Sequence, residues 1–243
     1  MKTLIKLIGA VQKDGELRYT REGLAILNFV VAGTQGKKPW FHRISVIGKF
    51  AEAIAERIKA GAIVSVQGEL VQDRWEKDGK TYSAVQIRAD GVRVLSNKGH
   101  EIVQDNGGFR LIGGMNVVFG YGNLTKAPVR RTTSNGTPVA NATVAVNRVF
   151  TSGGEKQEQV SYFDLTAWEA LAEELANLPK GTGIDFTGVL ENDSYETSGG
   201  EKRFTTRINV KRLFRAEPKL ADQGEKPAAG EPVAVGAEDD LPF

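Results

Sequence analysis

Aromatic rings with lysine and arginine beside them occur at two places in the first half of the chain. Trp40 and Phe41 follow a pair of lysines, and Trp75 and Tyr82 flank a turn that carries two more. A flat ring can stack on an unpaired nucleobase, and a neighbouring cation can pair with the phosphate backbone. The two segments therefore predict contacts with a single nucleic-acid strand that do not depend on its base sequence.

The second half carries a weaker version of this pattern. Tyr162 and Trp168 lie on one predicted strand, and Asp164 stands on it where the first half has Arg43. Tyr195 precedes a glycine-bearing turn, as Trp75 does in the first half. The candidate stacking residues are Phe41, Trp40, Trp75, Tyr82, Tyr162, Trp168, Tyr195 and Phe204.

Alternation along a strand separates the two adjacent rings of the first segment. Side chains of a strand point to opposite faces in turn, so one of Trp40 and Phe41 is expected to face outward. Arg43 shares the face of Phe41, which favours Phe41 as the outward ring. The alternative is that both rings pack in the core.

Candidate phosphate contacts are the basic residues beside these rings or at matching places in the second half. Each phosphate neutralised on a single strand adds roughly 0.7 to the slope of log affinity against log salt. The candidates are Arg18, Lys37, Lys38, Arg43, Lys49, Arg74, Lys77, Lys80, Arg130, Arg131, Lys202 and Arg203.

The net charge of +2 is a sum of unlike segments. Residues 1–98 carry 17 Lys+Arg against 10 Asp+Glu, residues 99–216 carry 13 of each, and residues 217–243 carry 2 lysines against 7 acids. Because the first segment holds the excess of cations, we expect it to supply most of the salt-sensitive affinity.

The chain lacks the residues that most enzymes and metal sites need. It has no cysteine, so disulfides and zinc ribbons are excluded, and its two histidines, His42 and His100, have no metal-ligand spacing. Phosphate-binding glycine loops and nucleophile elbows are absent, and Asp73 and Asp78 are interpreted as hairpin-turn acids. We therefore predict a protein without catalytic residues, cofactor or metal, located in a reducing cytoplasm and not in a membrane.

A repeat organises these residues, because the same series of glycines and apolar strands occurs twice. The repeated pairs are Gly9 and Gly122, Gly23 and Gly136, the strands at 28–32 and 141–145, Gly61 and Gly181, and Ile87 and Ile208. Each copy reads as three strands, a helix and two strands, and the second copy has extra residues before its third strand. This order is typical of the OB fold, a five-stranded Greek-key barrel. We predict a mainly β chain with barrels at 1–98 and 114–216, a linker at 99–113, and a disordered acidic tail at 217–243.

The chain ends in a motif of its own. Asp239 and Asp240 are followed by Leu241, Pro242 and Phe243, so two acids, an aromatic ring and the terminal carboxylate lie together. A pocket that accepts the ring and pairs the acids with lysine or arginine would bind such a tip. An acidic segment of this kind is otherwise a solvated spacer.

The combined pattern resembles bacterial single-stranded DNA-binding proteins over nearly the whole chain. The landmarks are Leu7-Ile8-Gly9, Leu17-Arg18-Tyr19-Thr20, Gly23, His42-Arg43, Gly48-Lys49, Ala51-Glu52, Gly61, Val64, Gly68, Trp75 and Asp78-Gly79-Lys80, and the tip resembles the family's partner-recruiting peptide. The two-barrel arrangement is similar to the Deinococcus-Thermus branch of the family. Two sites depart from the pattern: Ile47 replaces an aromatic residue that Trp168 keeps, and Arg18 to Thr20 becomes Val129 to Arg131 in the second copy.

The resemblance implies a function and an assembly. It implies a homodimer of four barrels, around which single-stranded DNA wraps during replication, recombination and repair. It also implies that the tip recruits replication and repair proteins, and that the protein is cytoplasmic and nucleoid-associated. The rival hypothesis is an OB-fold module that binds protein, oligosaccharide or structured RNA, with the aromatic residues packed in its core.

Overall fold

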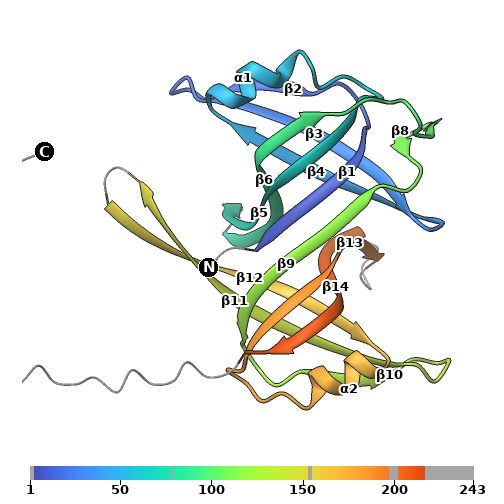
Figure 1. The fold of residues 1–243 in the computed structure, drawn as a ribbon. Helices are drawn as coiled ribbons and strands as arrows, with labels where there is room; N and C mark the ends of the chain where they lie inside the picture. The colour runs from blue at the N-terminus through green and yellow to red at the C-terminus, as the bar shows by residue number, and fades with distance from the viewer. Residues whose placement is uncertain (1–2, 78, 153–154, 197–201, 217–243) are drawn as a thin grey trace, which may run out of the picture.

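Alternation of buried and exposed residues defines the strands of this protein. Along β4 (Lys38–Ile47) the side chains of Trp40, His42 and Ile44 are buried, whereas those of Phe41 and Arg43 are exposed. The computed structural model describes residues 3–77, 79–152, 155–196 and 202–216. In this part of the chain the strands close into two barrels, one above the other in Figure 1.

Five strands close barrel 1. Going round the barrel from β1, the neighbours are β5, β6, β4 and β3, and β3 pairs again with β1. Their bounds are β1 (Leu4–Val11), β3 (Ala25–Gln35), β4 (Lys38–Ile47), β5 (Ile63–Lys77) and β6 (Lys80–Val94); the short β2 (Glu16–Tyr19) pairs with β3, and α1 (Lys49–Ala55) lies between β4 and β5. The predicted strands and helix are therefore present in the predicted order. The helix ends at Ala55, and Ile58 beyond its end is still fully buried.

Barrel 2 repeats the arrangement. Going round it from β9, the neighbours are β13, β14, β12 and β11, and β11 pairs again with β9. The bounds are β9 (Met115–Leu124), β11 (Pro138–Ser152), β12 (Glu155–Trp168), β13 (Gly183–Glu196) and β14 (Lys202–Arg215), with the short β10 (Val129–Thr132) beside β11 and α2 (Ala170–Ala176) after β12. Two five-stranded barrels, each with a helix between its third and fourth barrel strands, confirm the predicted fold class.

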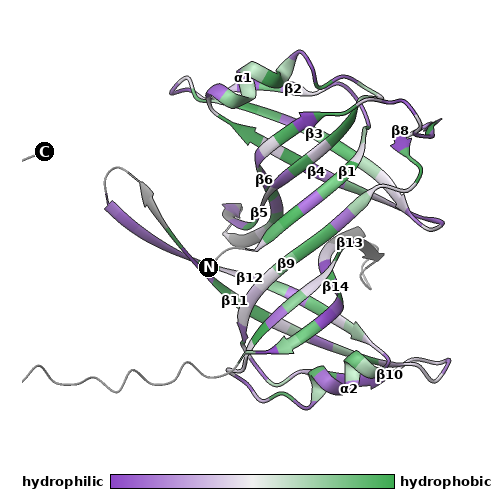
Figure 2. Ribbon diagram, in the orientation of Figure 1, coloured by the Kyte–Doolittle hydropathy of each residue, from purple (hydrophilic) through white to green (hydrophobic). Residues whose placement is uncertain are grey.

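The two barrels share one sheet through β1 and β9. These strands pair antiparallel, and Ile5 lies opposite Val118, which is its own counterpart in the repeat that relates Gly9 to Gly122. A residue paired with its own counterpart marks a local twofold axis, so the barrels are related by an internal pseudo-twofold. Figure 2 shows hydrophobic residues along both strands, interrupted by hydrophilic ones.

The linker predicted at residues 99–113 is a folded hairpin. Strands β7 (Ile102–Asp105) and β8 (Gly108–Leu111) pair with each other, and Leu111 is buried against Ala10 and Ile63 of barrel 1. The Gly113 N–H donates to the Thr34 hydroxyl at 2.7 Å, and the Thr34 N–H donates to the Gly113 carbonyl at 3.0 Å. The hairpin therefore holds the start of barrel 2 against barrel 1, which a polar spacer would not do.

The extra residues of the second copy lengthen one hairpin. Strands β11 and β12 stay paired as far as Ser152 and Glu155, and their far end projects from the barrel as a two-stranded arm (Figure 1). The predicted turn between the last two strands of barrel 1 is also a hairpin, because Lys77 pairs with Lys80.

Candidate nucleic-acid interface

A groove runs across the outer face of barrel 1. It has a volume of about 640 Å³ and is bordered by β2, β3, β4, β5 and β6. We call it the barrel-1 groove. Its charged lining consists of Lys13, Arg18, Arg43 and Arg88 together with Asp14, Glu16 and Asp73, and its remaining lining includes Asn28 and Ile47.

Barrel 2 has a groove at the equivalent place, which we call the barrel-2 groove. Its volume is about 310 Å³. In the repeat that relates Gly9 to Gly122, Lys126 and Arg131 occupy the positions of Lys13 and Arg18. In the later part of the repeat, which relates Ile87 to Ile208, Asp164 replaces Arg43 and Arg207 replaces Gln86. The internal pseudo-twofold thus repeats the groove but not its charges.

The strand register corrects one predicted alignment between the two copies of the repeat. Arg18 pairs with Ile26 on β3, and Arg131 pairs with Val139, the counterpart of Ile26, on β11. The counterpart of Arg18 is therefore Arg131, and the alignment of Arg18 with Val129 was wrong.

Two clefts lie where the barrels meet. Joint A, between β4 and β13, holds a cleft of about 280 Å³ with Phe41 in its wall. Joint B, between β12 and β5, holds a second cleft with Tyr162 in its wall. Phe41 and Tyr162 are counterparts in the repeat, so each joint presents one aromatic ring at the same place.

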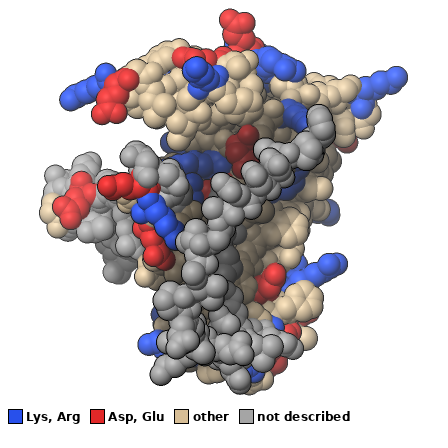
Figure 3. Space-filling view, turned by 60° about the vertical axis from the view of Figure 1, so that its left-hand side comes forward, with Lys and Arg blue, Asp and Glu red and all other residues tan. Residues whose placement is uncertain are grey.

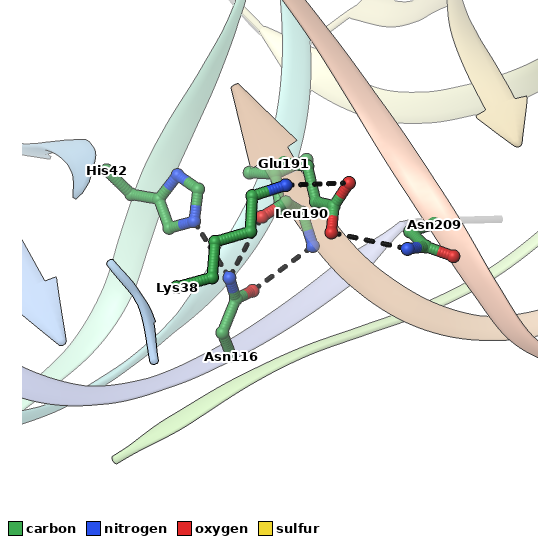
Figure 4. A network of polar contacts seen from close by, with 6 residues as sticks. All are labelled: Lys38, His42, Asn116, Leu190, Glu191 and Asn209. Atoms are coloured by element: carbon green, nitrogen blue, oxygen red, sulfur yellow. Dashed lines mark hydrogen bonds and ion pairs between the residues drawn. The ribbon is translucent and has the colours of Figure 1, made fainter. Parts of the chain in front are cut away.

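A buried polar network closes joint A (Figure 4). Asn116 binds the backbone of Leu190 on both sides: its Nδ2 donates to the Leu190 carbonyl at 2.9 Å, and its Oδ1 accepts from the Leu190 N–H at 3.2 Å. Asn116 Nδ2 also lies 3.0 Å from Nε2 of His42. At the rim, Lys38 lies 3.5 Å from Glu191, which accepts from Asn209 at 3.2 Å.

His42 is buried beside two side-chain amides and the backbone of Leu190, whose hydrogen bond opposes the effect of burial on the pKa of the ring. Its Nδ1 lies 3.3 Å from Nδ2 of Asn192, which donates to the Phe41 carbonyl at 2.8 Å. Burial lowers the pKa of His42 to about 4. A neutral ring can accept from one of the two amides, whereas a protonated ring would point donors at both, so the geometry also favours the neutral form.

Joint B is built from different residues. Gln72 accepts through Oε1 from the Tyr162 N–H at 3.2 Å, and its own N–H donates to the Ser161 hydroxyl at 3.4 Å. Arg148, at the base of the arm, lies 3.0 Å from Glu69 of barrel 1, whose side chain is 7% exposed. A buried ion pair thus ties the arm to the neighbouring barrel.

Three of the candidate stacking rings are exposed on the outer faces. Phe41 is 37% exposed, Tyr162 39% and Trp168 40%. Trp40 requires a correction, because its indole is only 7% exposed and lies 5.4 Å from the His42 ring in a stacked arrangement. The indole occupies the space that a Cβ at Gly33 would need, at 2.4 Å. Trp40 is therefore a core residue that borders the joint A cleft, not a platform for a base.

The candidate phosphate contacts divide into three groups. Arg18 and Arg43 line the barrel-1 groove and Arg131 the barrel-2 groove. Arg130 points elsewhere, since its guanidinium donates to both carboxylate oxygens of Glu173 at 2.6 to 2.9 Å and lowers the pKa of that carboxyl. Exposed lysines outside both grooves form the third group, namely Lys37, Lys38 and Lys49.

The remaining candidates lie where side chains are not described. The backbone register pairs Trp75 with Tyr82 across β5 and β6, and Tyr195 with Arg203 across β13 and β14. The tip at 239–243 lies outside the described residues altogether. The candidates whose side chains fall outside the description are Trp75, Tyr82, Tyr195, Phe204, Arg74, Lys77, Lys80, Lys202 and Arg203.

Four cations that line the grooves are not among the phosphate contacts predicted from the sequence. Lys13 and Lys126 are counterparts in the connection after the first strand of each barrel, and Arg88 and Arg207 lie on β6 and β14. No aromatic residue is next to them in sequence. The repeat itself was the signal, because the offset that relates Gly9 to Gly122 also pairs Lys13 with Lys126.

Charges of both signs share the surface. Figure 3 shows lysine and arginine interspersed with aspartate and glutamate among the described residues of one face. In the barrel-1 groove Arg88 lies 3.2 Å from Asp73, and Arg18 pairs with Glu16. Among the described residues no group of His, Cys, Asp and Glu could hold a metal ion, and no helix there is long and apolar enough to cross a membrane.

Comparisons with known proteins agree with this geometry. A model of the Single-strand binding protein family matches residues 3–95 and 115–215, which are the two barrels. The single-stranded DNA-binding protein of Thermus aquaticus is 36% identical over 257 residues, covering 98% of this chain and 97% of that protein. The protein of the same name from Deinococcus radiodurans is 37% identical over 243 residues, covering 95% of this chain and 80% of that protein. The crystal structure of the wild-type single-stranded DNA binding protein from Thermus aquaticus matches with a TM-score of 0.72 at 31% identity, over 93% of this chain and 98% of that one.

Proposed function

The chain belongs to the single-strand binding protein family, and from this premise we propose that it binds single-stranded DNA without sequence preference. The repetition of the groove carries the proposal. Each barrel has a groove with three or more cations on its outer face, and each joint between the barrels adds one exposed aromatic ring. The family and these relatives are named for DNA binding and not for catalysis.

The grooves and rings suit the two chemical features of a single strand. Cations in the grooves pair with phosphates, and each base stacked on an aromatic ring contributes about 1 to 3 kcal/mol. Phe41, Tyr162 and Trp168 provide the described rings. Neither contact reads the identity of a base, because every base has a flat face and every nucleotide a phosphate.

The local charges modify the expectation that barrel 1 dominates the salt dependence. The barrel-1 groove has four cations against three acids, and the barrel-2 groove has three cations against one. We therefore propose that the two grooves contribute comparably. If barrel 1 contributes more than barrel 2 to the salt dependence of binding, the excess comes from outside its groove, from the lysines and arginines at residues 37–38 and 74–80.

Titration with oligo(dT) tests the proposal against a protein- or sugar-binding OB module. We expect binding to weaken as salt rises, and single strands to bind more tightly than a duplex of equal length, measured by fluorescence anisotropy. Phe41→Ala should lower the affinity by about 1 kcal/mol or more. Tyr19→Ala removes another exposed ring of barrel 1 that does not line the described grooves, and it should have no such effect. Absence of salt-dependent binding would favour the rival module.

The acidic tip has a separate role in the proposal. We propose that Asp239 to Phe243 recruits replication and repair proteins, so that the chain protects exposed DNA and delivers enzymes to it. Deletion of the tip should leave DNA affinity unchanged or slightly raised, because a free acidic tail competes with phosphate for the basic barrels. A pull-down should lose its partners at the same time. Weakened DNA binding with every partner retained would refute the assignment.

A homodimer is the proposed assembly. The face of the shared sheet that points away from both barrel interiors carries Leu4 opposite Phe119, exposed by 42% and 50%, and Phe214 at 64%. Exposed apolar residues gathered on one face indicate a protein contact. Equilibrium sedimentation should give twice the chain mass of 26.4 kDa, and Phe119→Glu should shift it toward one chain. A single-chain mass for the unmodified protein would exclude the dimer.

A further inference from the structure

The row of side chains on the outer face of β12 differs from its counterpart on β4 at one charged position, where an aspartate stands in place of an arginine. On β4 the row reads Phe41, Arg43, Ser45 and Ile47, and on β12 it reads Tyr162, Asp164, Thr166 and Trp168, of which Thr166 is buried. Successive outward residues on a strand are about 6.7 Å apart. Asp164 therefore lies next to one exposed ring and two steps from another, where the edge of a stacked base would reach.

The Asp164 carboxylate is held in position by a neutral partner. Its Oδ1 accepts from the Thr143 hydroxyl at 2.9 Å, and it lines the barrel-2 groove with Lys126, Arg131 and Arg207. Within the described part of the chain it forms no ion pair, although the strand register places it opposite Arg207. The second carboxylate oxygen is thus left with hydrogen-bond capacity for a ligand.

We propose that Asp164 makes the barrel-2 groove selective for bases that carry an exocyclic amino group. A carboxylate only accepts hydrogen bonds. Cytosine and adenine offer an amino group on the Watson–Crick edge, and guanine offers a ring N–H beside one. Thymine offers a single N–H between two carbonyl oxygens, which a carboxylate repels. The inference rests on the proposed function, because it assigns a base preference to one of the two DNA grooves.

The other groove has a different preference at the same position. Arg43 carries only donors, so it favours the carbonyl oxygens of thymine and guanine. A strand that occupies both grooves meets a donor in one and an acceptor in the other. The chain as a whole therefore tolerates all sequences, while the two grooves differ in how they rank thymine against cytosine and adenine.

Competition between two homopolymers tests the proposal in the full-length protein. The dissociation constants for oligo(dT) and oligo(dC) of equal length are measured by anisotropy at one salt concentration near neutral pH. In Asp164→Asn the ratio of the oligo(dT) constant to the oligo(dC) constant should fall about threefold to tenfold relative to the unmodified protein. Asparagine keeps the size of the side chain and an oxygen for Thr143, but it adds an N–H₂ donor that suits thymine.

Two further variants separate the base preference from a change in charge. Glu174→Gln removes one negative charge from an exposed position on α2, away from the groove, and should leave the ratio unchanged. Asp164→Arg installs the residue of barrel 1 and should lower the ratio as Asp164→Asn does, with a steeper salt dependence. Equal ratios in the unmodified protein and both Asp164 variants, with both oligonucleotides bound, would overturn the proposal and leave the DNA-binding function intact. Failure of the unmodified protein to bind either oligonucleotide would overturn the proposed function itself.

Discussion

Replacement of His42 by phenylalanine should remove much of the acid sensitivity of the fold. Phenylalanine is a conservative choice, because Phe163 occupies the equivalent buried position in barrel 2. In that variant Asn116 keeps both of its hydrogen bonds to Leu190. The change therefore removes a titrating group from joint A and leaves the remaining contacts in place.

The magnitude follows from the pKa of His42. In the unfolded chain the pKa is 6.5, and in the folded protein it is about 4. Above pH 6.5 both states hold the ring neutral and the full stability is present. Between 6.5 and 4 only the unfolded chain takes up the proton, so stability is lost as the pH falls. Linkage gives a loss of about 2 kcal/mol between pH 7 and pH 5, and about 3 kcal/mol once the pH reaches 4.

Urea denaturation followed by tryptophan fluorescence at a series of pH values measures this loss. Carboxylates titrate in the same range, so the informative quantity is the difference between the unmodified protein and His42→Phe. His100→Gln changes the other histidine, which is exposed, and should follow the unmodified protein. If His42→Phe lost as much stability as the unmodified protein between pH 7 and pH 5, the buried imidazole would not be held neutral and the account of joint A would be wrong.

Three shorter predictions test other parts of the molecule. Tyr162→Ala should weaken binding to oligo(dT) by about 1 to 3 kcal/mol, and an unchanged affinity in anisotropy titrations would exclude stacking at joint B. Arg131→Ala should reduce the slope of log affinity against log salt by roughly 0.7. Arg130→Ala should not change the slope, because the Arg130 guanidinium is paired with Glu173. Equal slopes for both variants would contradict the geometry of the barrel-2 groove. Arg148→Met should lower the free energy of unfolding by about 3 kcal/mol, since it breaks an ion pair to a buried carboxylate. A loss within the error of thermal denaturation would show that joint B does not depend on the ion pair.

Local chemistry made much of the fold predictable. The strands of barrel 1 follow one another in the predicted order because a closed barrel has a dry inside and a wet outside, which imposes alternation on each strand. Outward placement of Phe41 followed from the same rule, applied to a cation two residues away. Arg43 marks the wet face in the sequence alone.

The phosphate assignments made from position in the sequence fared less evenly. Arg130 and Arg131 are adjacent and of the same type, yet one pairs with Glu173 on α2 and the other lines the barrel-2 groove. Lys13 has no aromatic neighbour in sequence and still lies in the barrel-1 groove. Proximity in sequence does not report which face of a barrel a side chain shares with residues from other strands.

The sequence alone determined two OB barrels with a candidate DNA-binding surface. It did so from features that can be read along the chain: aromatic rings beside basic residues, a repeated strand pattern and a change in composition at the tail. Only the tertiary structure decided the features that depend on contacts between residues far apart in the chain. In the tertiary structure the 99–113 linker folds onto barrel 1, Trp40 is buried against Gly33, and His42 lies between Asn116 and Asn192. Each of these outcomes depends on contacts between strands whose separation is fixed only when the barrels close and pair along β1 and β9.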